Sequence, residues 1–86
     1  MVTAIVMIQT DRDQINAVGE RLAGIEGINE VYSVSGRYDL IALIRLKNNE
    51  GLAELMTEKI AGVAGIKKTE SMIAFRKISK KDIAFT

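Results

Sequence analysis

Residues 31–46 read VYSVSGRYDLIALIRL, and this stretch decides the fold. A β-branched run is followed by the segment GRYD at residues 36–39 and then by an apolar run at residues 40–46. Gly36 ahead of a turn permits a positive φ, and Asp39 can hydrogen-bond nearby backbone N–H groups. The pattern predicts two neighbouring antiparallel strands joined by a tight turn, with the second strand buried.

Strand and helix patterns extend outward from this stretch in both directions. Upstream, residues 4–9 are apolar and β-branched and predict a buried strand. A helix follows, with Asp11 as its N-cap, Gln14 completing a capping box, and apolar residues at helical spacing. Downstream, residues 48–50 open a second helix, and residues 67–78 have the composition of a last strand.

The two halves form an internal repeat with a period of 38 residues. Asp11 aligns with Asn49 at the two helix starts, and the pair Gly27-Ile28 aligns with Gly65-Ile66, without a gap. Two strand–helix–strand units in tandem are the split βαβ arrangement. Right-handed crossovers then predict an α+β, ferredoxin-like βαββαβ fold: a four-stranded antiparallel sheet of order 4-1-3-2 with both helices on one face. We expect one domain over residues 1–78 and a C-terminal tail over residues 79–86.

The composition limits which functions are open to this chain. Its 86 residues suffice for one domain, and it has neither histidine nor cysteine, so the commonest general base and the thiolate metal ligands are absent. A net charge of +1 argues against tight non-specific nucleic-acid binding. No long apolar run predicts a membrane span, and the N-terminus does not read as a signal peptide, so the expected location is cytoplasmic. We expect no cofactor and no metal.

Alternation along the two central strands sorts their residues by face. One face is entirely apolar and is assigned to the helices: Ala4, Val6, Ile8, Ala42, Ile44 and Leu46. The opposite face carries Ile5, Met7, Ile41 and Leu43, with Arg45 toward one end. Such a patch is large for a monomer, so we predict that a second copy covers it in a C2 dimer, sheet against sheet. The alternative is that the C-terminal tail folds back over this face.

Two groups of residues are candidate ligand contacts. The hairpin residues 36–39 offer turn amides for a carboxylate, Asp39 for a cation and Tyr38 as an amphipathic wall, which together suit a zwitterion such as a free amino acid. A purely structural turn is the alternative. Thr69 and Ser71 alternate on the last strand, and we expect them on the same sheet face as Ile41. An ordinary half-exposed edge strand explains them equally well.

The hairpin sequence also resembles a known family. Residues 31–40, followed by an apolar strand, are similar to the effector domain of the Lrp/AsnC regulators, in which a Val-rich strand runs into Gly-x-Tyr-Asp. Residues 62–71 resemble the family's Gly-Val segment ahead of a Thr-x-Thr strand, with Ala64 where proline is frequent. The resemblance covers residues 2–78. This sequence lacks the N-terminal helix-turn-helix of those regulators. The resemblance is therefore to the family's stand-alone effector modules, which are of the dimeric α/β-barrel type.

The resemblance implies a function and a set of partners. Family members form sheet-to-sheet dimers that assemble into octamers or similar rings, and amino acids bind between neighbouring dimers. Carried over, this implies a homo-oligomeric, non-enzymatic amino-acid sensor that modulates a full-length Lrp/AsnC regulator, without direct contact to nucleic acid or membrane. The rivals are a small dimeric α/β-barrel enzyme and a purely structural adaptor. The implied ligand contacts are Gly36, Arg37, Tyr38, Asp39, Thr69 and Ser71.

Overall fold

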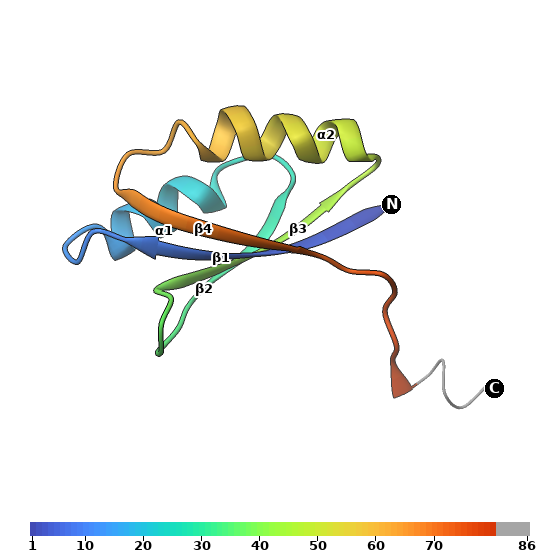
Figure 1. Cartoon of the computed structure of the whole chain (residues 1–86), viewed down its shortest axis with the longest axis horizontal. Helices are drawn as coiled ribbons and strands as arrows, with labels where there is room; N and C mark the ends of the chain where they lie inside the picture. The colour runs from blue at the N-terminus through green and yellow to red at the C-terminus, as the bar shows by residue number, and fades with distance from the viewer. Residues whose placement is uncertain (81–86) are drawn as a thin grey trace.

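The computed structural model describes residues 1–80, and it has the predicted ferredoxin-like architecture. The strands form one sheet of order β2-β3-β1-β4, with every neighbouring pair antiparallel. Both helices lie on the same side of that sheet (Figure 1). No described helix has the length and apolar character needed to cross a membrane. The elements are β1 (Val2–Thr10), α1 (Ile15–Ala23), β2 (Ile28–Ser33), β3 (Leu40–Leu46), α2 (Asn49–Glu54), the π-helix η1 (Leu55–Ile60) and β4 (Ile66–Ile73).

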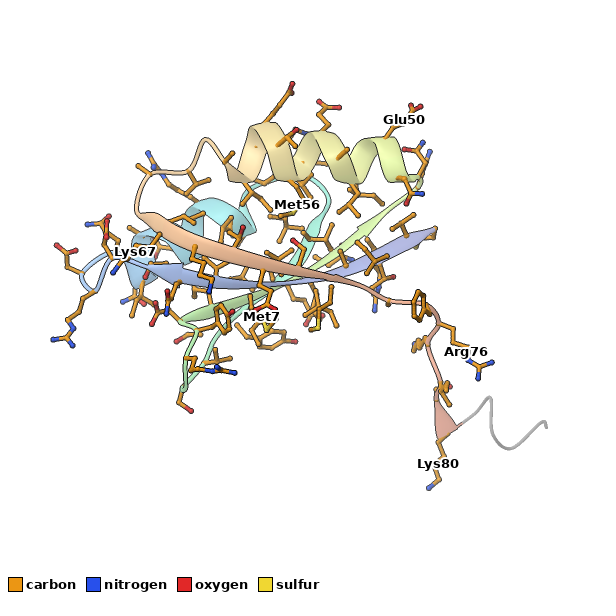
Figure 2. The ribbon with its side chains drawn as sticks, in the orientation of Figure 1. Met7, Glu50, Met56, Lys67, Arg76 and Lys80 are labelled. Carbon is orange, nitrogen blue, oxygen red and sulfur yellow. The ribbon has the colours of Figure 1, made fainter. Side chains whose placement is uncertain are left out.

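The core lies between the sheet and the helices. Register pairs Ala4 with Ile44 and Val6 with Ala42, and all four side chains are fully buried beneath Val18 and Leu22 of α1. The face assigned to the helices from sequence alternation is therefore confirmed for β1 and β3. Figure 2 shows the two sides directly, with Met56 between helix and sheet and Met7 on the far side. We call this far side the open face.

The helix starts differ from the sequence predictions by a few residues. Asp11 does not cap α1: its backbone N–H donates to the Gly65 carbonyl at 2.9 Å, and the N-cap position is Gln14, whose side chain makes no capping bond. The predicted capping box is therefore wrong. In the second half the cap is Asn48, one residue before the predicted equivalent, and its Oδ1 accepts from the Gly51 N–H at 2.8 Å.

The second helix changes its winding halfway along. It runs as α-helix through α2 and continues without a break as the π-helix η1. Leu55 and Ile60 are both 2% exposed although they are five positions apart. A π-helix bonds i to i+5, so this spacing keeps both side chains on the core side of the helix.

A β-bulge follows the glycine of each half and reverses the side-chain alternation. In β2, Ile28 pairs with Ile44 and Val31 with Ala42, so three residues on β2 span two on β3. In β4, Ile66 pairs with Thr10 and Thr69 with Ile8, so again three residues span two. An extra residue shifts every later side chain to the other face. The two bulges occupy equivalent positions in the 38-residue repeat.

The last strand ends earlier than the sequence predicts. β4 stops at Ile73 rather than residue 78, and the Ala74 N–H makes a final bond to the Thr3 carbonyl at 2.9 Å. Residues 74–80 then run away from the sheet on its open side (Figure 1). We call this segment the arm. Of the predicted tail, residues 79 and 80 belong to the arm, and residues 81–86 lie outside the described part of the chain.

Candidate functional site

The predicted tight turn between β2 and β3 is a longer loop. Residues 34–39 lie between the two strands, and the Val34 N–H donates to the Asp39 carbonyl at 3.0 Å to close the loop. Gly36 has φ +115°, so the positive φ predicted for it is confirmed. The loop projects from the sheet on the open side, at the end opposite the arm (Figure 1).

Three hydrogen bonds fix this loop to the end of β1. The Asp39 N–H donates to the Ile8 carbonyl at 2.9 Å, and Gln9 Nε2 donates to the Arg37 carbonyl at 2.8 Å. Asp39 Oδ2 accepts from the backbone N–H of Thr10 at 2.8 Å. A carboxylate that accepts from a backbone amide is an anchoring group, so Asp39 has the structural role that the sequence had left open for it. These bonds fix the backbone of the loop and so limit the positions that its exposed side chains can take.

Tyr38 connects the loop to the opposite edge strand. Its hydroxyl donates to the carboxylate of Glu70 on β4. Glu70 pairs with Met7 in the β1–β4 register, so both lie on the open face. Sequence reasoning missed Glu70, because it is 32 residues from Tyr38 and only the strand order and the bulge bring the two together.

Two opposite charges act on the pKa of the Tyr38 phenol. The hydrogen bond to Glu70 is the main cause that raises the pKa of Tyr38, followed by burial and by the negative charge of Glu70. The positive charge of Arg37 acts in the other direction and lowers that pKa. Both charges are therefore near enough to act on the same phenol.

Thr69 and Ser71 do not join this cluster. Thr69 pairs with Ile8 and Ser71 with Val6, so both lie on the helix-covered face, and the Ser71 hydroxyl contacts Met56 Sδ at 3.9 Å. The prediction that they share a face with Ile41 is wrong. The bulge after Ile66 is the physical reason, because it reverses the alternation along β4.

The predicted interface residues do lie together on the open face. Ile5 pairs with Leu43 and Met7 with Ile41, and all four are only partly buried in the single chain. Arg45 is exposed at the end of the strand nearest the arm. Tyr32 and Met72, each 47% exposed, extend the apolar surface toward both sheet edges. Within residues 1–80, no group of three acidic side chains is arranged to hold a metal ion.

The Tyr38–Glu70 bond predicts a pH dependence. Because the folded-state pKa of Tyr38 is raised above its ordinary 10.0, the stability that this bond contributes is present below pH 10.0 and is lost as the pH rises through the folded-state value. Ultraviolet titration of tyrosinate should give a midpoint above 10.0 for Tyr38. The substitution Glu70→Gln should move that midpoint back toward the ordinary value.

The titration needs one control. The pKa of Tyr32 is also raised, mainly by its hydrogen bond to Glu30, so the experiment is run in a Tyr32→Phe background to isolate Tyr38. An unchanged midpoint in Glu70→Gln would show that the two side chains are not bonded in solution.

Comparison with known proteins places this geometry in context. Residues 3–83 match the model of the Lrp/AsnC ligand binding domain. An uncharacterized HTH-type transcriptional regulator of Pyrococcus furiosus is 32% identical over 82 residues, which make up 92% of this chain and 55% of the regulator. The chain therefore spans about half the length of the curated relatives it matches.

Two solved structures share the fold. The protein TTHA0845 of Thermus thermophilus is 41% identical, with a TM-score of 0.87, and the match covers 93% of this chain and 100% of that protein. A feast or famine regulatory protein of M. tuberculosis, solved in complex with L-methionine, is 27% identical with a TM-score of 0.78. That match covers 93% of this chain and 54% of the regulator.

Proposed function

This chain belongs to the Lrp/AsnC ligand binding domain family, and we propose that it is an amino-acid-sensing oligomerisation module rather than an enzyme. The observation that carries the proposal is the hydrogen bond from the Tyr38 hydroxyl to Glu70, which joins a carboxylate of β4 to the loop that also carries Arg37. The M. tuberculosis relative solved with L-methionine supports an amino acid as the ligand class. The match to an HTH-type transcriptional regulator of Pyrococcus furiosus supports a regulatory rather than an enzymatic role.

The proposed binding mode uses the hairpin loop and β4. The α-carboxylate of the ligand pairs with the Arg37 guanidinium, whose fork of donors suits carboxylates, and with the amides near Gly36. The α-ammonium pairs with Glu70, which keeps acceptor capacity after it receives the Tyr38 hydroxyl. The Tyr38 ring provides an apolar wall for the side chain of the ligand. Asp39 holds the loop in place.

The proposed assembly begins at the open face. Two copies pack sheet against sheet and cover Ile5, Met7, Ile41 and Leu43, as face-to-face sheets do at a spacing of about 10 Å. The loops at the rim of this dimer then meet those of neighbouring dimers in an octamer or a similar ring. A ligand bound between dimers favours one assembly state only if it binds that state better. Through this shift the module would tune a full-length regulator of its family with which it co-assembles.

Titration calorimetry against the twenty amino acids tests the sensing proposal. We expect at least one small amino acid to release heat and to change the particle mass in light scattering. In Glu70→Gln the dissociation constant should rise by about 10- to 100-fold, because a charge-assisted bond worth roughly 1.5–3 kcal/mol is lost.

The matched control is Glu30→Gln. Glu30 makes the same kind of bond, accepting from the Tyr32 hydroxyl, but it lies on β2 at the other edge of the sheet. Its replacement should leave ligand affinity unchanged. Absence of heat with all twenty amino acids would reject sensing and leave the structural adaptor as the better description.

A further inference from the structure

The arm carries large apolar side chains that its own domain leaves uncovered. Phe75 is 103% exposed and Ile78 is 63% exposed. Residues 74–79 lie outside every strand and helix, and Figure 2 shows the arm leaving the sheet and pointing away from the helices as far as Lys80. A phenylalanine left in water forgoes one of the largest favourable burial contributions that a side chain can make. An exposed aromatic on an extended segment therefore points to a partner surface.

A notch separates the arm from the open face. It has a volume of about 680 Å³, and its lining includes Ile5 and Leu43 from the sheet and Phe75 and Arg76 from the arm. The notch continues directly from the apolar patch that the proposed dimer covers. A segment of a second copy that packs on this patch can therefore also lie in the notch, between the sheet and the arm.

We propose that the arm of each copy packs against a second copy of this chain, with Phe75 as its apolar anchor. This inference rests on the sheet-to-sheet dimer of the proposed function. Seven residues in extended conformation reach at most about 23–25 Å, which is more than twice the spacing of about 10 Å between packed sheets. The arm is therefore long enough to cross the interface and lie against the facing sheet.

Charge complementarity supports a second copy as the occupant. The arm carries the cations Arg76, Lys77 and Lys80, and the open face carries the carboxylates Glu30 and Glu70 on its two edge strands, with the cation Arg45 at the end nearest the arm. Each copy thus holds a basic arm and, on the two edge strands of its open face, one carboxylate each that the arm of a partner can pair with. In a C2 dimer the contact between an arm and the facing sheet forms twice, once for each copy.

Sedimentation equilibrium of Phe75→Ala tests the proposal. Two phenylalanine side chains lose their cover in each dimer, so the dimer dissociation constant should rise by about 100-fold or more. The matched control Phe75→Leu keeps an apolar anchor and should stay within about 10-fold of the parent protein. Equal dissociation constants for Phe75→Ala and the parent dimer would overturn the arm contact while leaving the dimer itself intact. A parent protein that sediments only as a monomer would instead reject the dimer, and the arm contact with it.

A second measurement separates contact with a partner from contact with the arm's own sheet. The substitution Ile41→Glu places a charge on the open face away from the notch and should give a monomer. In that background, Phe75→Ala should leave the urea midpoint unchanged, because the anchor has no partner to bind. A lowered midpoint would show that Phe75 packs on its own domain, and it would overturn the proposal.

Discussion

Replacing Ile41 with glutamate is expected to convert the dimer into a folded monomer. Ile41 lies on central strand β3 between Met7 of β1 and Tyr32 of β2, so its side chain is near the middle of the open face. In a sheet-to-sheet dimer the substitution buries two unpaired carboxylates in an apolar interface, and each costs several kcal/mol. The dimer dissociation constant should rise by at least about 1000-fold.

The single chain should tolerate this change. Ile41 is only partly buried in the absence of a partner, so a glutamate there can reach water. Analytical ultracentrifugation measures the mass, and circular dichroism confirms that the sheet and helices persist. The matched control is Ala53→Glu, which introduces the same charge at an exposed position on α2 and should leave the mass unchanged. A dimer of undiminished affinity in Ile41→Glu would remove the open face as the interface.

Sequence patterns predict the fold of this chain because the two halves repeat one simple unit. Alternation in β1 and β3 identifies the buried residues Val6 and Ile44, and both are fully buried in the structure. The glycines ahead of the second and fourth strands have positive φ, +100° at Gly27 and +95° at Gly65, which marks the sharp entry into each strand. Apolar alternation predicts burial and glycine predicts a positive φ, and both are properties of the residue types at those positions.

The candidate site was less predictable because it depends on strand register. Alternation counted along β4 cannot reveal the bulge after Ile66, so Thr69 and Ser71 were predicted on the wrong face. The same shift brings Glu70 to the open face, where it meets Tyr38. No local sequence signal distinguishes Glu70 from the other glutamates, since its role arises from a contact between distant parts of the chain.

The arm shows a different limit of sequence analysis. The apolar residues 72–75 and Ile78 have the composition of a strand end, so the strand was predicted to run to residue 78. Pairing stops at Ile73, which faces Ala4 of β1, and one last backbone bond joins the Ala74 N–H to the Thr3 carbonyl, although β1 itself extends to Val2. Neither the composition of residues 74–78 nor the length of β1 marks this end, so the sequence could not place it.

A pair of identical substitutions on one strand should separate the folding role of β3 from its assembly role. Ile44 and Ile41 lie three positions apart on opposite faces of β3, and Ile44 is fully buried under the helices. Ile44→Ala should lower the free energy of unfolding by about 2–5 kcal/mol, since it removes buried atoms and leaves a cavity. This loss is a large part of the roughly 4–13 kcal/mol expected for a domain of 86 residues.

Ile41→Ala should affect the dimer dissociation constant more than the free energy of unfolding of the monomer. In the monomer its cost should be below about 1 kcal/mol, because the side chain is already in contact with water and little burial is lost. In the dimer the same substitution removes apolar contact from both copies and should weaken association by about 10-fold or more. Urea unfolding at protein concentrations below and above the dimer dissociation constant measures the two contributions separately. Equal effects of Ile41→Ala and Ile44→Ala on the monomer would mean that the open face is buried by the chain itself, and sheet-to-sheet assembly would lose its physical cause.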